Sequence, residues 1–542
     1  MNDDVRAAIP DRQACVLRYL LEAQAEKIPD RIFARFHGGP TWTYAQTLAR
    51  VQQRAATLRR EGVKQGDRVL CWMGNGPELL TSWFAINYLG AVYVPLNTGL
   101  RGRPLAHVLD NAQASLMVAH RALAGRLHDV APGALTRVLL TGEDPRDAPL
   151  QPPAGVSLAP LSDAAEPPPP ALLALDAPIE PWDTQSIMYT SGTTGLSKGV
   201  VTSYVQIYTM GPDAFDWITP DDRCMIAGPI FHCGSTLYVY AMLAYGGSIA
   251  MVPEFRTDQF WDAIRDTEST VVLLLGVMAN FLLKQAPSPR DREHRLRGVF
   301  IVPFGEDAPA FQARFGVDLY TVYNMTEIAS PLSAGPGLTE AGRCGKPRPW
   351  FELRVGDAQD RAVPDGTVGE LLIRSHRPWA LFSGYYRNPE ATAASMRNGW
   401  FHTGDAFRRD ADGTFFFVDR LKDVIRRRGE NISSFELEGE ICAHPDVREA
   451  VAVAVPSVHS EDEVLAVVTA VDGARVDEAA LIAWLAERVP HYMVPRYVRV
   501  VDDLPKTASG KLQKHVLRSE GLADGTWDRE AAGIKLRRER LA

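Results

Sequence analysis

The chain has 542 residues, of which 46% are hydrophobic and 23% charged, and its formal net charge is −8. This length and composition are typical of a soluble enzyme with more than one domain, and the acidic balance argues against a nucleic acid or an anionic membrane surface as partner. The six cysteines are scattered without a Cys-x-x-Cys pair, which indicates neither a zinc site nor a disulfide framework and fits a reducing cytosol.

Helix and strand patterns alternate along the N-terminal part of the chain. Apolar residues recur at helical spacing over residues 44–60, and Gly62 then stops the predicted helix. A second helical pattern over 76–89 leads into an apolar strand at 91–95. Four consecutive prolines at 167–170 are typical of a surface loop of polyproline II type. Because the alternation recurs, we expect a large N-terminal domain of layered α/β structure.

A short loop rich in glycine and hydroxyl side chains follows. Residues 189–200 read Tyr-Thr-Ser-Gly-Thr-Thr-Gly-Leu-Ser-Lys-Gly-Val. Glycines turn the backbone sharply and present N–H groups to an anion, the hydroxyls add donors, and Lys198 adds a mobile positive charge. The pattern therefore predicts a phosphate-binding loop, although a flexible surface loop has the same composition. It is not a Walker A loop, because Lys198 follows Ser197 and precedes Gly199.

Targeting and membrane segments are not expected. The N-terminus, Met-Asn-Asp-Asp, is acidic, unlike a signal peptide. The longest apolar run, residues 271–283, contains Asn280 and is too short to cross a bilayer, so it predicts a buried strand that continues into a helix. We therefore expect a cytoplasmic protein without a membrane span.

The chain beyond Arg420-Leu421-Lys422-Asp423 has the pattern of a second, smaller domain. Two helices and two strands are expected there in a compact α+β order, at 434–443, 448–455, 463–471 and 477–488. We place the domains at residues 1–421 and 422–542 and expect the smaller one to be mobile. The charged tail from Ala523 is expected to be poorly ordered.

The 189–200 loop is one of a series of motifs between about residue 40 and residue 514. The others are Thr-Trp-Thr-Tyr at 41–44, Gly-Ala-Val-Tyr-Val-Pro-Leu-Asn at 90–97, Tyr-Asn-Met-Thr-Glu at 323–327, Trp-Phe-His-Thr-Gly-Asp at 400–405, Val-Asp-Arg-Leu-Lys-Asp at 418–423, Gly-Glu-Asn at 429–431 and Leu-Pro-Lys-Thr-Ala-Ser-Gly-Lys at 504–511. In this order and spacing the series resembles the adenylate-forming superfamily: acyl-CoA synthetases, the adenylation domains of peptide synthetases, and luciferases. The run at 429–438 is similar to the carnitine/crotonobetaine-CoA ligase branch.

The resemblance implies an ATP-dependent acid–thiol ligase that uses Mg²⁺ and coenzyme A. A carboxylate attacks the α-phosphate of ATP to give an acyl-AMP and pyrophosphate, and a thiol then displaces AMP. The first step needs positioned phosphates, a metal, and a cation near the developing charge. Three alternatives stay open: acyl transfer to the phosphopantetheine of a carrier protein, a non-catalytic AMP-binding regulator, and a P-loop NTPase or kinase, which the misplaced lysine opposes. A homodimer is one assembly to test.

The resemblance assigns phosphate and metal contacts to two motifs. The loop residues that would cradle the β- and γ-phosphates are Thr190, Ser191, Gly192, Thr193, Thr194, Gly195 and Lys198. Thr190 and Glu327 would hold Mg²⁺, a hard cation that prefers oxygen ligands. Thr326 would donate to the α-phosphate. Outside such a motif, Glu327 would be an ordinary surface carboxylate.

The nucleoside contacts come from two further motifs. Tyr323 would stack on adenine, with Asn324 beside it in the nucleotide site. Asp405 would accept both ribose hydroxyls, because a carboxylate offers two acceptor oxygens, and Arg420 would add a second ribose contact. The family's Gly-Gly-Ala-Pro-Leu run, which forms the adenine wall, is replaced here by Phe-Gly-Glu-Asp-Ala-Pro at 304–309, so that wall is not assigned.

Lys511 resembles the family lysine that bridges the substrate carboxylate and the α-phosphate, where its role is electrostatic. As an isolated residue it would be a solvated lysine, which is how we interpret its neighbours Lys506 and Lys514. Lys422 resembles the hinge about which the small domain rotates between the two half-reactions, although a solvated lysine in a fixed linker is the alternative.

After that rotation, Gly429, Glu430 and Asn431 would face the site and help to form the pantetheine tunnel. Three successive arginines precede them at 426–428. One of these, with Arg426 the first candidate, would meet a phosphate of CoA or AMP, since arginine binds phosphate with two hydrogen bonds. The alternative is that all three form a solvated face.

Phe231 and His232 match family positions that line the acyl pocket, although a histidine there could also be a core residue with its hydrogen bonds satisfied. Asn324 stands where many family members have glycine. Its side chain would intrude on the acyl tunnel and present a polar amide, which favours a small or polar carboxylic acid over a long, straight fatty acid.

Overall fold

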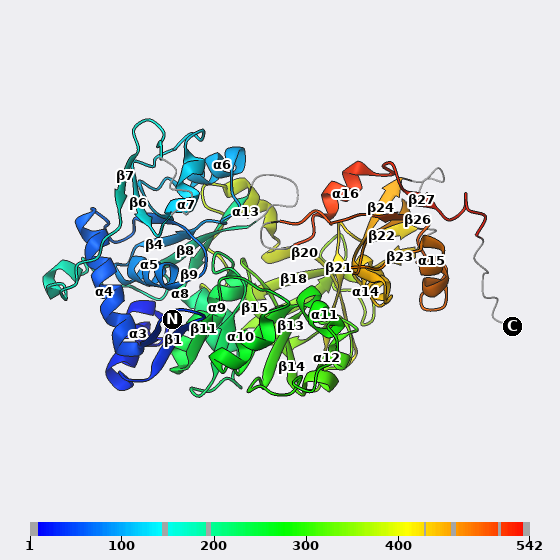
Figure 1. Ribbon diagram of the computed structural model, residues 1–542, viewed down its shortest axis with the longest axis horizontal. Coiled ribbons are helices and arrows are strands. Elements are labelled where there is room, and N and C mark those ends of the chain that lie inside the picture. The colour runs from blue at the N-terminus through cyan, green and yellow to red at the C-terminus, as the bar shows by residue number, and fades with distance from the viewer. Residues whose placement is uncertain are drawn as a thin grey trace.

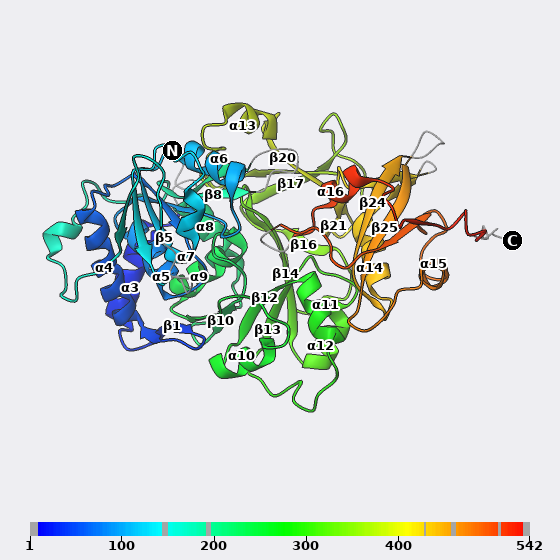
Figure 2. The same ribbon diagram turned by 45° about the horizontal axis from the view of Figure 1, so that its top comes forward.

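The computed structural model describes residues 9–143, 150–190, 197–427, 430–456, 462–507 and 511–534. The chain has a mixed α/β fold with a large N-terminal domain and a separate, smaller C-terminal domain. Figures 1 and 2 show the two at opposite ends of the molecule, with the N-terminal helices in blue and the C-terminal elements in orange and red. The expected fold class is therefore confirmed.

One layer of the large domain is a seven-stranded sheet in the order β7-β6-β5-β3-β4-β8-β9. Its strands are β3 (Arg68–Trp72), β4 (Val92–Pro95), β5 (Leu116–His120), β6 (Arg137–Thr141), β7 (Ser157–Pro160), β8 (Thr184–Thr190) and β9 (Lys198–Ser203). All neighbours pair in parallel except β8 and β9, which form an antiparallel hairpin at the sheet edge. The 189–200 loop is the turn of that hairpin.

A second layer is a 14-stranded sheet in the order β17-β18-β20-β21-β16-β15-β14-β13-β12-β10-β11-β1-β2, with β19 beside β20. Its strands are β1 (Ile32–Phe36), β2 (Thr41–Thr43), β10 (Arg223–Ile226), β11 (Ser248–Met251), β12 (Val271–Leu275), β13 (Gly298–Val302), β14 (Asp318–Met325), β15 (Ala329–Ala334), β16 (Arg343–Pro347), β17 (Phe351–Gly356), β18 (Gly369–Ser375), β19 (Met396–Arg397), β20 (Trp400–Arg409) and β21 (Phe415–Arg420). The sheet is parallel from β1 through β11 and β10 to β14, and antiparallel from β14 to β17.

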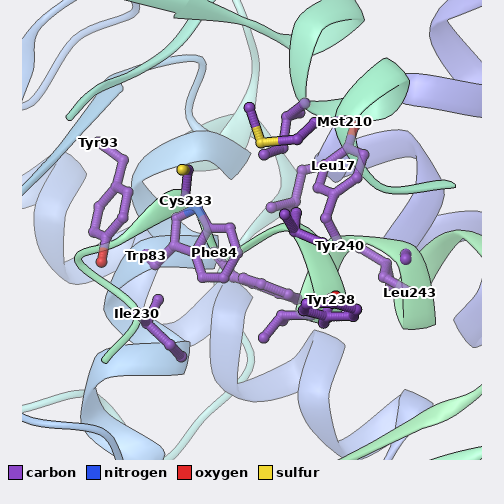
Figure 3. Packing of buried hydrophobic residues seen from close by; sticks show 14 of the residues in the cluster. Leu17, Trp83, Phe84, Tyr93, Met210, Ile230, Cys233, Tyr238, Tyr240 and Leu243 are labelled. Carbon is purple, nitrogen blue, oxygen red and sulfur yellow. The ribbon is translucent and has the colours of Figure 1, made fainter. Parts of the chain in front are cut away.

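Helices fill the space between the two sheets and cover their outer faces. The helices of the large domain are α2 (Arg12–Cys15), α3 (Leu17–Lys27), α4 (Tyr44–Arg60), α5 (Pro77–Tyr88), α6 (Gly102–Ala112), α7 (Arg121–Ala124), α8 (Tyr204–Met210), α9 (Cys233–Tyr245), α10 (Phe260–Thr267), α11 (Gly276–Lys284), α12 (Ala308–Phe315) and α13 (Pro389–Ser395), with short 3₁₀ turns at η1 (Gly125–Leu127), η2 (Pro170–Leu173) and η3 (Pro212–Ala214). The largest hydrophobic cluster includes residues of both sheets and of the helices between them, and Figure 3 shows Trp83 and Phe84 of α5 and Tyr238 of α9 among its buried side chains.

The helices and strands predicted in this domain are present. A capping box between Thr43 and Gln46 starts α4, which ends at Arg60, two residues before Gly62. The apolar run at 271–283 forms β12 and continues into α11, as expected. The last proline of the 167–170 run begins the 3₁₀ turn η2, so only the residues before it stay extended. No helix among the described residues is both long enough and apolar enough to cross a membrane.

The C-terminal domain is built on a four-stranded sheet in the order β24-β25-β26-β27. Its elements are β22 (Ile425–Arg427), β23 (Glu430–Ile432), α14 (Ser434–Cys442), β24 (Val447–Pro456), β25 (Asp462–Ala470), α15 (Glu478–Ala486), β26 (Tyr497–Val500), α16 (Lys514–Glu520) and β27 (Trp527–Asp528). The expectation of a poorly ordered tail from Ala523 is wrong for residues 523–534. Asp528 pairs with Tyr497 in the sheet and forms a 3.1 Å ion pair with Arg496.

A polar network links the end of β21 to the C-terminal domain. Asp419 Oδ2 accepts hydrogen bonds of 2.6 Å from both the amide and the hydroxyl of Ser434, the first residue of α14. Lys514 donates to the same hydroxyl, and its Nζ lies 2.8 Å from Glu438 Oε1. The interpretation of Lys514 as solvated is therefore wrong. Lys506 is likewise not solvated, because its Nζ lies 2.7 Å from Glu449 Oε2.

Two buried arginines share one carboxylate where the antiparallel half of the large sheet meets the helical layer. Arg377 Nη1 and Arg348 Nη2 lie 3.1 Å and 3.2 Å from Asp213 Oδ2, and only 5% and 11% of the two arginine side chains are exposed. Arg377 also stacks on Trp350 at 4.2 Å. Because a buried cation without a partner carries a large desolvation cost, the negative charge of Asp213 stabilises this junction by balancing the positive charges of the two arginines.

We expect Asp213→Ala to destabilise the protein by about 3 kcal/mol, because the change leaves two buried guanidinium groups without their shared carboxylate. Asp365→Ala is the control: Asp365 lies 2.6 Å from Arg409, but the two side chains are 41% and 43% exposed, so the loss should stay below about 1 kcal/mol. Urea denaturation followed by tryptophan fluorescence measures both. Equal shifts of the midpoint would contradict the role given to Asp213.

Candidate active site

The ends of the phosphate-loop motif face each other across the β8–β9 hairpin. Thr190, the last residue of β8, is paired with Lys198, the first residue of β9, and its hydroxyl donates to the Lys198 carbonyl at 3.4 Å. His107 of α6 lies 2.8 Å from the carbonyl of Ser197 through Nε2. The predicted contacts of Ser191, Gly192, Thr193, Thr194 and Gly195 lie outside the described residues.

Glu327 lies in the turn between β14 and β15 and is buried, with 6% of its surface exposed. Its Oε1 accepts a 2.9 Å hydrogen bond from the hydroxyl of Tyr385, and its carbonyl accepts one of 2.8 Å from the amide of Phe382. Burial raises the pKa of this carboxyl, while the Tyr385 hydrogen bond and the positive charges of Lys198 and Lys511 oppose the rise. Glu327 is therefore an oriented carboxylate rather than a surface residue.

The start of helix α9 contacts the same turn. Thr326 Oγ1 donates to Cys233 Sγ at 3.2 Å, and the Thr326 carbonyl accepts a 2.7 Å hydrogen bond from Gln206 Nε2. His232 is the residue before α9, its ring lies 5.3 Å from that of Phe231, and both residues are half-buried. Burial, reinforced by the positive charge of Lys511, lowers the pKa of His232 to about 4, so its imidazole is neutral at pH 7.

Strands β20 and β21 bring the second carboxylate to the site. Asp405 and Arg420 are direct neighbours in the sheet, and Arg420 Nε lies 3.8 Å from Asp405 Oδ1. The hydroxyl of Tyr323 donates to Asp405 Oδ2 at 2.7 Å. Burial raises the pKa of Asp405, with Arg420 and Tyr323 opposing. The Tyr323 ring is buried against the edge of Phe407, and its predicted contact with adenine stays a prediction, as does that of the half-buried Asn324 beside it.

Lys511 reaches this site from the C-terminal domain. Its backbone is held by Thr507, which accepts from the Lys511 amide through Oγ1 at 3.1 Å and donates to its carbonyl at 2.7 Å. The residue keeps an exposed surface, yet it interacts electrostatically with Glu327, Asp405 and Arg420. Desolvation by the surrounding protein, together with the Arg420 charge, lowers the pKa of Lys511. Lys511 is therefore a cation of the C-terminal domain that lies within electrostatic reach of charged residues of the large domain.

The remaining predicted residues lie around the domain connection. Lys422 is exposed in the turn after β21, next to Asp423, whose carboxylate lies 2.8 Å from Arg518. Arg426 pairs with Asn431 in the β22–β23 hairpin, and Glu430 belongs to the same hairpin. Gly429 lies outside the described residues. The predicted CoA contacts of this segment stay predictions.

Arg427, the second of the three successive arginines, belongs to the core of the small domain. Its side chain is 1% exposed, lies 2.6 Å from Glu463, and donates to the carbonyls of Tyr492 and Val494. A guanidinium enclosed in this way is a structural group, so the interpretation of all three arginines as a solvated face is wrong at Arg427.

The donor set fits magnesium and a nucleoside triphosphate. Glu327 and Thr190 offer oxygen ligands, and the described residues contain no group of three or more His, Cys, Asp or Glu side chains that could enclose a metal by themselves. Mg²⁺ is commonly held by one or two protein oxygens together with substrate phosphates. Lys198, Arg420 and Lys511 supply positive charge for those phosphates.

Two residues outside the predicted motifs contact the site. Tyr385 binds Glu327 and lies under Lys198, and Gln206 holds the carbonyl of Thr326. Tyr385 occurs in the run Phe-Ser-Gly-Tyr-Tyr at 382–386, in which an aromatic residue follows a glycine. That run has no spacing typical of a chemical motif, so only the packing of the chain identifies its role.

Comparisons with known proteins give a consistent result. Residues 21–386 match the family of AMP-binding enzymes, and residues 436–511 match the C-terminal domain of AMP-binding enzymes. The crotonobetaine/carnitine–CoA ligase of Salmonella paratyphi A is 32% identical over 494 residues, which cover 88% of this chain and 93% of that protein.

Two solved structures are similar over nearly the whole chain. ATP-bound MatB from Rhodopseudomonas palustris has a TM-score of 0.75 at 28% identity, with 92% of this chain and 98% of that chain covered. The anthranilate CoA ligase AuaEII in complex with anthranoyl-AMP has a TM-score of 0.81 at 22% identity and covers 93% of this chain and 96% of that chain, which shows the same fold. Because one family match spans more than half of the sequence and a relative with 32% identity covers 88% of it, the chain belongs to the family of AMP-binding enzymes.

Proposed function

We propose that this protein ligates a carboxylic acid to coenzyme A, using ATP and Mg²⁺, through an acyl-AMP intermediate. The observation that carries the proposal is the position of Lys511, which comes from the C-terminal domain and interacts with Glu327 and Asp405 of the large domain. In this arrangement a carboxylate that would bind the metal, a carboxylate that would bind the ribose and a lysine of the small domain lie within electrostatic reach of one another. The similarity to crotonobetaine/carnitine–CoA ligase supports the same reaction class.

In the first step, a carboxylate oxygen of the acid attacks the α-phosphorus of ATP, and the bond to pyrophosphate breaks. Asp405 would hold the ribose, Thr326 would donate to the α-phosphate, and Lys198 would bind the outer phosphates. Mg²⁺, when bound, neutralises charge on the phosphate oxygens. Lys511 would lie against both the acid and the α-phosphate, where its positive charge stabilises the pentavalent transition state.

In the second step, the thiol of coenzyme A attacks the acyl carbon and AMP leaves. We propose that the small domain rotates for this step about Lys422, with the boundary between residues 421 and 422. The rotation would withdraw Lys511 and bring Gly429, Glu430 and Asn431 to the site. It would also break the bonds from Asp419 to Ser434, which span that boundary in the present orientation.

We propose a small or polar acid as the substrate. Asn324 would present an amide to the acyl pocket that Phe231 and His232 would line, and the neutral imidazole of His232 could exchange hydrogen bonds with such an acid. The relatives named above include ligases of crotonobetaine or carnitine and of anthranilate, which are compact or polar acids. A carrier-protein phosphopantetheine remains the alternative acceptor. A non-catalytic regulator would have no need of Lys511, Glu327 and Asp405 in one site.

We also propose a cellular location and binding partners for the enzyme. Six cysteines, Cys15, Cys71, Cys224, Cys233, Cys344 and Cys442, are free thiols, which fits the reducing cytoplasm. The partners would be the acid, ATP and coenzyme A, with no nucleic acid. A homodimer is one assembly to test, and sedimentation velocity would test it.

Pyrophosphate release by the purified enzyme tests the function. With ATP, Mg²⁺ and a panel of acids that includes carnitine, crotonobetaine, short-chain and aryl acids, one acid should yield AMP and pyrophosphate in equal amounts, and a thioester when CoA is added. ADP or orthophosphate as the product would rule out the proposal. A thioester formed only with a carrier protein would select the alternative acceptor.

Lys511→Ala should lower the rate of acyl-AMP formation by at least about 10²- to 10³-fold, the usual effect of removing one charge-stabilising donor. Thioester formation from supplied acyl-AMP should be largely spared, because the proposed rotation withdraws the lysine before that step. Single-turnover assays of each half-reaction measure the two rates, and Lys346→Ala is the control, because the Lys346 ammonium is exposed and lies 3.7 Å from the exposed Asp412. An equal loss in both half-reactions would refute the two-orientation assignment.

Lys422→Pro should have the opposite effect to Lys511→Ala: it should spare acyl-AMP formation and impair thioester formation. Proline fixes φ near −65° and removes the backbone N–H, so the proposed hinge loses part of its conformational range. If the small domain is then held in the present orientation, acyl-AMP should form and stay bound while CoA turnover collapses. Lys422→Ala, which keeps the backbone free, is the control. Parallel loss of both half-reactions, or no loss, would contradict a hinge at this residue.

A further inference from the structure

One side chain outside the predicted motifs, Tyr385, joins two of them. Its hydroxyl donates to Glu327 Oε1 at 2.9 Å, and Lys198 Nζ lies 4.8 Å from the centre of its ring. Glu327 and Lys198 come from different sheets of the large domain. The carboxylate expected to bind the metal and the ammonium expected to bind the phosphates are therefore oriented by the same residue.

The backbone around Tyr385 is fixed from both sides. Tyr385 forms a β-bridge with Val200 of β9, and the Tyr386 amide donates to the Gly199 carbonyl at 2.7 Å. The Phe382 amide donates to the Glu327 carbonyl at 2.8 Å. Residues 382–386 therefore connect the end of the phosphate loop to the Glu327 turn, and we call this segment the 382–386 brace.

The side chain itself has little freedom. The ring of Tyr385 packs edge-on against Phe382 at 5.0 Å, and its amide donates to Thr392 Oγ1 at 2.9 Å. The Tyr385 hydroxyl is the donor in its hydrogen bond to Glu327 Oε1. A hydroxyl held by a rigid ring fixes the rotation of the carboxylate that accepts from it.

We propose that Tyr385 is a positioning residue for the first half-reaction: its hydroxyl orients the Glu327 carboxylate toward the metal, and its ring seats the Lys198 ammonium against the phosphates. The role of Tyr385 in catalysis rests on the proposed function. Its effect on the binding of metal and nucleotide does not depend on that function. Outer partners of metal ligands typically change metal affinity by about 10- to 100-fold when they are removed.

Three substitutions separate the two roles. Tyr385→Phe keeps the ring under Lys198 and removes the hydroxyl, whereas Tyr385→Leu removes both. Tyr386→Phe is the matched control, because Tyr386 lies in the same brace but packs against the hydrophobic cluster of the seven-stranded sheet. Binding of Mn²⁺ in the presence of a non-hydrolysable ATP analogue, followed by electron paramagnetic resonance, reports on the metal site without turnover. Calorimetry with the analogue alone reports on the phosphate site.

We expect Tyr385→Phe to weaken Mn²⁺ binding by about 10- to 100-fold while binding of the metal-free analogue changes less than about threefold. Tyr385→Leu should weaken both, and Tyr386→Phe neither. In the ligase assay, Tyr385→Phe should lower kcat for pyrophosphate release with little change in KM for the acid. Unchanged Mn²⁺ affinity in Tyr385→Phe, or an equal loss in the control, would overturn the proposal.

A double-mutant cycle tests whether Tyr385 acts through Glu327. Glu327→Gln should by itself weaken Mn²⁺ binding, and adding Tyr385→Phe should then cause no further loss, because residues that act as a unit are not additive. Fully additive losses would overturn the proposal.

If Tyr385→Phe does not fold, 3-fluorotyrosine is placed at position 385 instead. The chemical shift of its ¹⁹F resonance should change when Mg²⁺ binds to the complex with the ATP analogue, and an unchanged chemical shift would overturn the proposal. These binding results stand even if no acid releases pyrophosphate, so failure of the proposed function would be seen separately.

Discussion

The arrangement of the site depends on one electrostatic constraint: two buried carboxylates lie among three cations that come from three segments of the chain. Burial alone would favour the neutral forms of Glu327 and Asp405, and the positive charges of Lys198, Arg420 and Lys511 favour their ionised forms. Glu327 and Asp405 supply two negative charges against three positive ones. The surplus positive charge, in a site reached from solvent, suits a polyanionic substrate such as a nucleoside triphosphate.

The two carboxylates and the lysine are supported differently, and this difference matches the chemistry. Tyrosine hydroxyls hold Glu327 and Asp405 at 2.9 Å and 2.7 Å, and both residues belong to the large domain, Asp405 on β20 and Glu327 in the turn between β14 and β15. Lys511 is held by local bonds to Thr507, in a short segment of the small domain. Groups that bind the nucleotide throughout the reaction benefit from rigid support, whereas a cation required in only one step can be carried on a separate domain.

Polar contacts join the two domains, beside an aromatic contact in which Phe417 of β21 packs edge-on against Phe435 of α14 with 5.7 Å between the ring centres. Asp419 caps the start of α14 through Ser434, and Lys284 of α11 donates to the carbonyl of Cys442 near the end of the same helix at 2.9 Å. Burial raises the pKa of Glu438 to about 7 although Lys514 opposes the rise, so this network contains a carboxyl that is costly to keep charged. Hydrogen bonds of this kind can be replaced by hydrogen bonds to water when one domain moves against the other. A large apolar interface would oppose such a movement.

The sequence by itself determined the helices and strands, because their signals depend on spacing along the chain. Helical periodicity predicted α4, which a capping box at Thr43 starts, and the resemblance of the motifs to a known family implied that Glu327, Asp405 and Lys511 belong to one site, where the three interact electrostatically. Packing alone decided three further points. Tyr385 supports the predicted residues, Lys514 and Arg427 are enclosed rather than solvated, and Asp528 completes a sheet edge. Local pattern says which residues can form a helix or bind a phosphate, but the partner of a buried charge is chosen by segments that meet only when the chain has folded.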